Sequence, residues 1–187
     1  MNQQRLDFLE KLKAYWVKEN IPNVSELNGQ FLNFLIKSQG VKSMLEIGCA
    51  NGYSTIWITD ALEETWGKLI SYDVSLPSFN EAKENLKEIW LDHLVDFRFW
   101  NILDKDLTPT EMFDFIFVDA RKKYYLQFFE AVKPLMKKGC TVFFDDVVKF
   151  KHKMQSFYDY IENQKDYEWF VLPIDEDDWV LILRAKT

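Results

Sequence analysis

The run from Met44 to Thr55 constrains this chain more than any other segment, because an apolar stretch ends in a glycine-containing turn and a helix-forming stretch follows at once. Gly48 and Gly52 carry no Cβ, so they can adopt positive φ angles and let a ligand approach the backbone. The first N–H groups of the following helix would face an anionic group placed there. A dinucleotide does not suit this spacing, because the third glycine of Gly-x-Gly-x-x-Gly would fall at Tyr53, whose ring would obstruct a pyrophosphate. The segment predicts a strand, a ligand-binding turn and a helix.

The composition indicates one compact folded domain, since 48% of the 187 residues are hydrophobic and 17% are aromatic. We expect a helical region over residues 1–40 and a core over residues 41–187. The formal net charge of −7 and the pI of about 5.0 argue against a broad nucleic-acid-binding face. No apolar run approaches the ~18 residues of a membrane span, and no export signal is apparent, so a cytoplasmic protein with reduced thiols at Cys49 and Cys140 is expected.

The pattern of apolar residues predicts an α/β fold. An N-terminal helix is expected over residues 5–19, ended by Ile21-Pro22, and a second over 27–39, ended by Gly40. Apolar runs predict parallel strands over 41–47, 69–73, 95–100, 113–119 and 140–145. Helices are predicted over 55–64, 78–90, 124–137 and 154–163, and an antiparallel hairpin over 167–172 and 179–184. Together these elements predict a mostly parallel seven-stranded sheet with helices on both faces.

Three carboxylates follow neighbouring strands of the predicted sheet. Asp119 ends one apolar run, and Asp145 and Asp146 end the next. Ligands bind beyond the carboxyl ends of parallel strands, so these side chains should lie beside the glycine turn. At ~4 Å and an effective dielectric constant near 20, each pair of like charges costs roughly 4 kcal/mol, so convergence would favour a bound cation or a raised pKa. Oxygen ligands favour Mg²⁺, Mn²⁺ or Ca²⁺ over zinc, although Asp145 and Asp146 could also simply end a strand in solvent.

Several segments carry a family resemblance. The Glu46-x-Gly48-x-Ala50-x-Gly52 turn resembles motif I of class I S-adenosylmethionine-dependent methyltransferases. Four segments in the same order resemble the cation-dependent O-methyltransferases of the catechol and caffeoyl-coenzyme A type, namely residues 28–32, 46–55, 113–125 and 138–147. Residues 172–175 resemble the entry to that family's final hairpin. The resemblance implies a Rossmann-like methyltransferase domain that transfers a methyl group from S-adenosylmethionine to a hydroxyl of a small aromatic or catechol-like acceptor.

The resemblance also implies roles for individual residues. Asp119, Asp145 and Asp146 match metal ligands, and Lys122 matches a catalytic lysine that acts beside Asp119. Asp73 matches the acid that binds the ribose hydroxyls, and Asn101 falls near the expected place of the adenine, although either could be an ordinary turn residue. The full set of implied cofactor-binding residues is Glu46, Gly48, Ala50, Gly52, Tyr53, Ser54, Asp73, Asn101 and Asp119.

The implied mechanism depends on charge. A cation that binds two neighbouring acceptor oxygens would lower the pKa of the hydroxyl, and Lys122 would then accept the proton. For that role the pKa of Lys122 must be lowered, which a nearby metal ion and partial burial would both favour. Alternatively, Lys122 is a solvated member of the basic run 121–123. Tyr124 and Tyr125 are expected to pack at a helix start and to have no chemical role.

Two departures separate the chain from that family. Its third metal ligand is usually an asparagine, and here Asp146 adds a negative charge. The acceptor-side loop is also short, because residues 147–152 lead almost directly into the last helix. The identity of the acceptor is therefore not carried over.

Other functions remain open on the sequence alone. A hydroxyuridine of transfer RNA is an alternative acceptor, for which Lys149, Lys151, His152 and Lys153 could form a local basic lip. A non-catalytic S-adenosylmethionine-binding protein is a second alternative, and it would bind the cofactor whether or not Mg²⁺ is present. Exposed aromatic residues could form a homodimer interface.

Overall fold

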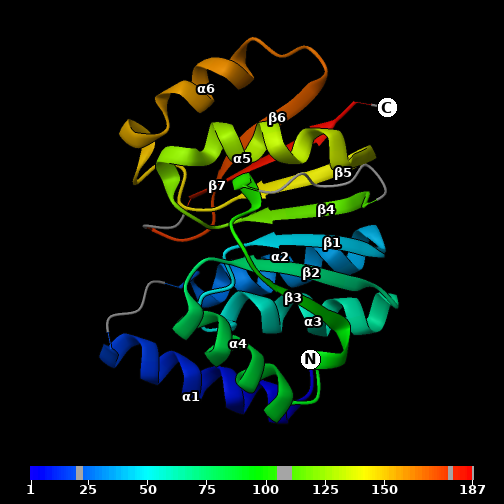
Figure 1. Ribbon diagram of the computed structural model, residues 1–187, viewed down its shortest axis with the longest axis vertical. Helices are drawn as coiled ribbons and strands as arrows, with labels where there is room; N and C mark the ends of the chain where they lie inside the picture. The colour runs from blue at the N-terminus through cyan, green and yellow to red at the C-terminus, as the bar shows by residue number, and fades with distance from the viewer. Residues whose placement is uncertain (20–22, 105–110, 177–178, 187) are drawn as a thin grey trace.

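A seven-stranded sheet lies at the centre of the molecule (Figure 1). The computed structural model describes residues 1–19, 23–104, 111–176 and 179–186. The strand order is β3-β2-β1-β4-β5-β7-β6. Five strands are parallel: β1 (Ser43–Ile47), β2 (Lys68–Asp73), β3 (Val95–Phe99), β4 (Phe113–Val118) and β5 (Met136–Phe144). The last two, β6 (Tyr167–Pro173) and β7 (Trp179–Ala185), form an antiparallel hairpin beside β5, which confirms the predicted fold class.

Two helices precede the sheet, α1 (Gln3–Glu19) and α2 (Glu26–Gln39), as predicted. The hydroxyl of Ser25 caps α2 by accepting a hydrogen bond from the N–H of Asn28 at 3.1 Å. Gly40 ends α2 in the left-handed conformation, at φ 63°. The predicted stop at Ile21-Pro22 lies outside the described residues.

Helices cover both faces of the sheet. The remaining α-helices are α3 (Tyr53–Thr65), α4 (Leu76–Glu88), α5 (Tyr125–Val132) and α6 (Gln155–Glu162). Alternate residues of β4 show how the two cores divide: Phe115 and Phe117 pack in one core with residues of α1 to α4, and Ile116 and Val118 pack in the other with residues of α5 and α6. All four are fully buried. In Figure 1, α5 and α6 accordingly lie above the central strands and α1, α3 and α4 below them.

One predicted element was wrong at its end. A helix was expected over residues 124–137, but α5 ends at Val132. Pro134 follows within a single 3₁₀ turn (Lys133–Leu135), because proline has no N–H to donate and cannot continue the helix. Met136 therefore begins β5 earlier than the sequence suggested. Among the described residues, no helix is both long and apolar enough to span a bilayer.

Candidate active site

Two cavities meet at the carboxyl ends of the parallel strands, where the strand order reverses between β1 and β4. The first, here called the β2-side cavity, has a volume of about 610 Å³ and is lined by residues that follow β1, β2 and β3. The second, the β5-side cavity, has a volume of about 560 Å³ and is lined by residues that follow β4 and β5. Ala50, Asp119, Ala120 and Arg121 line both cavities, so a molecule in one can reach a molecule in the other.

The glycine turn, residues 48–52, contributes Ala50 to the lining of both cavities. Gly48 has a φ of 94°, and a Cβ at this position would lie 2.1 Å from the carbonyl oxygen of Asp119. Gly52 has a φ of 89° and immediately precedes α3. Ala50 also has a positive φ, of 45°, which the sequence did not indicate. The turn can thus follow this path because glycines occupy its two tightest positions.

Asp73 ties the end of β2 to this turn. Its Oδ2 accepts hydrogen bonds from the N–H groups of Cys49 at 3.1 Å and Ala50 at 3.0 Å, and its Oδ1 accepts one from Ser75 at 2.7 Å. Asp73 also lines the β2-side cavity together with Asn101. The two residues that the resemblance implies for the ribose and adenine therefore lie in one cavity, and their contact with a cofactor stays a prediction.

Glu46, Tyr53 and Ser54 are buried beneath the turn, and neither cavity has any of them in its described lining. The carboxylate of Glu46 accepts hydrogen bonds from the hydroxyls of Ser54 (2.8 Å), Thr55 (2.8 Å) and Ser71 (2.6 Å). Burial raises the pKa of Glu46 to about 7, although the three hydroxyl groups act in the opposite direction. The ring of Tyr53 faces Trp16 of α1, at 6.3 Å between centroids. Contact of these side chains with a cofactor stays a prediction. In the structure, the hydrogen bonds of Glu46 to Ser54 and Thr55 join β1 to the start of α3 on the two sides of the turn.

Three carboxylates converge on one ammonium group, and their convergence was predicted from their positions at the ends of neighbouring strands. We call Asp119, Asp145 and Asp146 the carboxylate cluster. Nζ of Lys122 lies 2.7 Å from Oδ1 of Asp119, 3.6 Å from Oδ2 of Asp146 and 4.0 Å from Oδ2 of Asp145. The Lys122 side chain is only 11% exposed, so it is not a solvated member of a surface basic run.

The charge state of Lys122 in the protein differs from the sequence-based expectation. Burial lowers the pKa of Lys122, but the negative charges of Asp119, Asp145 and Asp146 outweigh burial and raise the pKa well above its ordinary value. The expected lowering presupposed a bound cation, and the carboxylates alone produce the opposite effect. In the protein by itself, Lys122 is a charged ammonium group that partly neutralises the cluster.

Two residues that hold the cluster were missed by the sequence reasoning. The hydroxyl of Tyr125 accepts a hydrogen bond from Nζ of Lys122 at 2.9 Å and donates one to the carbonyl oxygen of Asp145 at 2.9 Å. Tyr125 therefore does more than pack, and its position three residues after Lys122 was the available signal. Nδ2 of Asn28, on α2, donates to Oδ1 of Asp145 at 2.6 Å, and both residues are buried.

The donor chemistry of the cluster suits a hard cation, because all of its side-chain ligands are carboxylate oxygens. Within the part of the chain that the structure describes, however, no three His, Cys, Asp or Glu side chains stand ready to hold a metal ion. The ammonium of Lys122 lies among the carboxylates. The residues therefore fit a cation chemically, provided that Lys122 moves.

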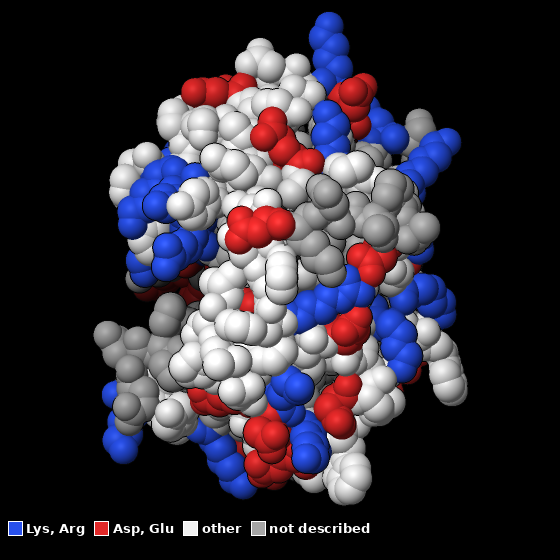
Figure 2. Space-filling view, viewed as in Figure 1, with Lys and Arg blue, Asp and Glu red and all other residues white. Residues whose placement is uncertain are grey.

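Basic and aromatic side chains surround the β5-side cavity. Arg121, Lys123 and Lys153 line it with Phe150, and the ammonium groups of Lys149 and Lys153 lie 5.9 and 4.8 Å from the centroid of the Phe150 ring. We call Arg121, Lys123, Lys149 and Lys153 the basic rim. Figure 2 shows a cluster of basic side chains on the left of the view, next to the ends of α5 and α6. Among the described residues, none of the four forms an ion pair with a carboxylate.

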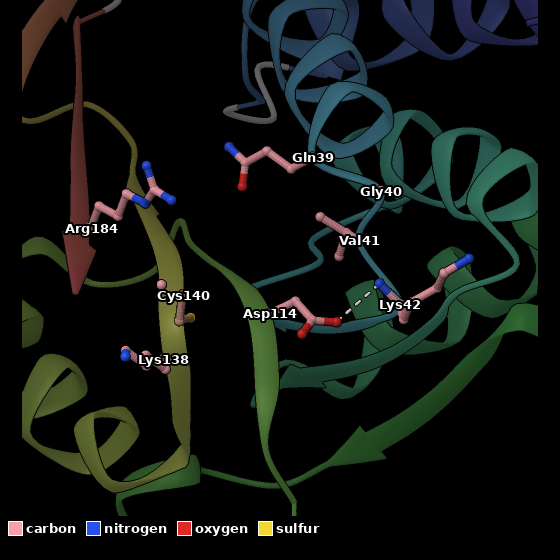
Figure 3. Close-up of a pocket in the computed structure, with 9 residues that line it drawn as sticks. Gln39, Gly40, Val41, Lys42, Asp114, Lys138, Cys140 and Arg184 are labelled. Atoms are coloured by element: carbon pink, nitrogen blue, oxygen red, sulfur yellow. Dashed lines mark hydrogen bonds between the residues drawn. The ribbon is translucent and has the colours of Figure 1, made fainter. Parts of the chain in front are cut away.

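A third cavity, of about 430 Å³, opens at the opposite ends of the strands, where β1 and β4 begin (Figure 3). Asp114 lies in its wall and accepts hydrogen bonds from the N–H groups of Lys42 at 3.0 Å and Ser43 at 2.9 Å. Its other oxygen pairs with Lys137 at 2.9 Å. These contacts join the starts of β1, β4 and β5, so the role of Asp114 is structural.

Comparison with known proteins agrees with this architecture. A family model described as O-methyltransferase matches residues 2–168. A caffeoyl-CoA O-methyltransferase of Medicago sativa is 33% identical over 135 residues, which make up 69% of this chain and 54% of that protein. The chain thus spans about half the length of this curated relative.

Solved structures match over nearly the whole chain. An O-methyltransferase of Bacillus cereus in complex with SAH superposes with a TM-score of 0.82 at 26% identity, over 96% of this chain and 91% of that one. An O-methyltransferase of Streptomyces achromogenes involved in tomaymycin synthesis, in complex with SAM, has a TM-score of 0.84 at 24% identity, over 96% and 90% of the two chains, and supports the fold. With the family model covering most of the sequence, the chain belongs to the O-methyltransferase family.

Proposed function

We propose that this protein transfers a methyl group from S-adenosylmethionine to a hydroxyl of a small aromatic or catechol-like acceptor, with the help of a divalent cation such as Mg²⁺. The observation that carries the proposal is that the carboxylate cluster and Lys122 line the β5-side cavity, and that Asp119 lines the β2-side cavity as well. The β2-side cavity would hold the cofactor, with the backbone of Gly48 and Ala50 against its methionine end, Asp73 at its ribose and Asn101 near its adenine. The β5-side cavity would hold the acceptor.

The reaction needs alignment more than activation of the donor. A methyl sulfonium is already electrophilic, so an acceptor oxygen held in line with the methyl carbon can displace the thioether as the carbon–sulfur bond breaks. A cation held by Asp119, Asp145 and Asp146 would supply Lewis acidity that lowers the pKa of the acceptor hydroxyl.

Lys122 is the residue that would accept the proton of the acceptor hydroxyl. Lys122 can accept the hydroxyl proton only when its amine is neutral, and the carboxylate cluster opposes this in the protein alone. Positive charge brought into the site by the bound ligands acts in the favourable direction. While Lys122 stays protonated, its Nζ can instead donate a hydrogen bond to the developing oxyanion.

Titration calorimetry tests this proposal. S-adenosylmethionine would be titrated into the protein with and without Mg²⁺ and a simple catechol, and the product thioether would be assayed in the same mixtures. The test variant is Asp145→Ala, and the control is Asp159→Ala, which removes an exposed carboxylate of α6. Ternary binding and turnover that need Mg²⁺, and that only Asp145→Ala abolishes, are expected. Cofactor binding that ignores both metal and mutation would refute the cation-assisted mechanism and favour a non-catalytic binding protein.

The basic rim favours a second acceptor class, a modified nucleoside in transfer RNA. On a chain of net charge −7, the rim gathers four basic side chains at the β5-side cavity, and two of them, Lys149 and Lys153, lie against the ring of Phe150. This arrangement suits phosphates and bases. Filter binding of tRNA at increasing salt, with the wild type and Lys153→Glu, would test it. Salt-sensitive binding that the variant weakens would support a tRNA acceptor, and absence of binding at low salt would exclude it. A cytoplasmic location and a homodimer stay predictions of the sequence.

A further inference from the structure

Lys122 occupies the place in the carboxylate cluster where a cation would be expected. Its Nζ is 2.7 Å from Oδ1 of Asp119 and within 4.0 Å of carboxylate oxygens of both Asp145 and Asp146. Oxygen ligands lie about 2.0–2.6 Å from Mg²⁺ or Ca²⁺. A metal ion bound to Asp119, Asp145 and Asp146 together would therefore compete with the ammonium group for the space between these carboxylates.

Two oxygens outside the three carboxylate groups also bind the ammonium group of Lys122. The hydroxyl of Tyr125 lies 2.9 Å from Nζ, and the carbonyl oxygen of Asp145 lies 3.3 Å from it. Tyr125 is itself fixed, because its fully buried ring packs against Phe144 and Phe157 at centroid distances of 5.5 and 6.2 Å. These two oxygens remain available as partners for Nζ if its bond to Asp119 is broken.

We propose that Lys122 is the resident counter-cation of the carboxylate cluster, and that a divalent cation binds there by displacing the ammonium from Asp119 towards Tyr125 and the Asp145 carbonyl. The inference rests on the proposed function for the identity of the metal site. It adds that metal affinity is set by competition with a side chain of the same protein. Metal binding and the Lys122–Asp119 ion pair are then mutually exclusive.

Binding of Mg²⁺ alone tests the competition without any acceptor. Calorimetric titrations would compare the wild type, Lys122→Met and Lys123→Met, with Mn²⁺ as a second probe. Lys123→Met is the matched control, because it removes the same charge from the next residue, which is exposed and contacts Tyr124 instead of the cluster. We expect Lys122→Met to bind Mg²⁺ at least 10-fold more tightly than the wild type, and Lys123→Met to stay within about 2-fold of it.

The outcomes separate this inference from the proposed function. Equal or weaker Mg²⁺ binding by Lys122→Met would overturn the competition, even if the wild type binds S-adenosylmethionine and methylates an acceptor. Failure of the wild type to bind S-adenosylmethionine would instead count against the methyltransferase proposal, while the metal comparison would still decide the competition. Thermal unfolding would check that each variant folds, and Lys122→Gln would replace Lys122→Met if it does not. Adding Asp145→Ala to the tighter variant must remove the gain.

Discussion

Replacement of the buried Glu46 by glutamine should change how the stability of the protein depends on pH. Glu46 is fully buried between β1, β2 and α3, and three hydroxyl groups donate to its carboxylate. Burial raises its pKa from the ordinary 4.5 to about 7, because the charged form loses its hydration. Between these two pH values the folded protein keeps a proton that the unfolded chain releases. Stability must therefore fall as the pH rises through this interval.

The size of the effect follows from the two pKa values. Each pH unit between them corresponds to about 1.4 kcal/mol of unfolding free energy, so the interval from 4.5 to about 7 corresponds to about 3 kcal/mol. The stabilisation is complete below pH 4.5 and absent above about pH 7. Asp60 and Asp114 act in the opposite sense, because their lowered pKa values remove stability as the pH falls. Their contribution is the same in both proteins and cancels in the difference.

Urea unfolding at pH 5, 6, 7 and 8 would measure this effect as the difference between the wild type and Glu46→Gln. The variant cannot ionise, so its stability relative to the wild type should rise by about 2 to 3 kcal/mol from pH 5 to pH 8, because part of the effect lies below pH 5. Glu168→Gln, at an exposed position of β6, is the control and should show no such trend. A difference that stays within 0.5 kcal/mol across this range would refute the raised pKa, whatever the absolute stability of the variant.

Three further predictions follow from single contacts. Gly48→Ala should lower the unfolding free energy, measured in urea, by about 3 kcal/mol or more, because the added Cβ would lie 2.1 Å from the carbonyl oxygen of Asp119. The control is Gly40→Ala, which also has a positive φ but has no neighbouring atom within 4 Å of the added Cβ. It should lower the unfolding free energy by only about 1 kcal/mol. Asp73→Ala should weaken S-adenosylmethionine binding at least 10-fold by calorimetry, and unchanged affinity would contradict its role. Phe157→Ala should lower the unfolding free energy by about 3 to 5 kcal/mol, since this buried ring lies 4.7 Å from that of Phe144; a loss below 1 kcal/mol would contradict that packing.

Local patterns were sufficient to predict most of the fold. Each parallel strand contains a mainly apolar stretch, and all of them except β3 end at, or directly before, a glycine or an aspartate. The strand positions, and the end of the sheet that carries the site, therefore followed from the sequence. The convergence of Asp119, Asp145 and Asp146 followed from the same reasoning. The end of α5 was misplaced because the helical spacing continues past Pro134, although the missing N–H of that proline already argued against a helix.

The directions in which individual side chains point, and the charge states that result, could not be predicted from the sequence in the same way. Whether Glu46 faces a cavity or the core depends on which hydroxyls of α3 and β2 lie over it in the folded protein. The contact of Asn28 with Asp145 joins residues 117 positions apart. It requires α2 to lie close to α3, where a Cβ on Gly29 would meet the ring of Trp57 at 2.4 Å. Such contacts follow only from the packed structure.

The same packing explains how an aspartate is accommodated at position 146. The family resemblance implies an asparagine there, and a third carboxylate adds repulsion to the cluster. Asp146 has a φ of 57°, and its Oδ2 lies 3.6 Å from Nζ of Lys122, so the added charge faces a buried ammonium. That ammonium is held by Asp119 and Tyr125 at the same time. The additional carboxylate thus strengthens the hold of the cluster on the Lys122 ammonium group.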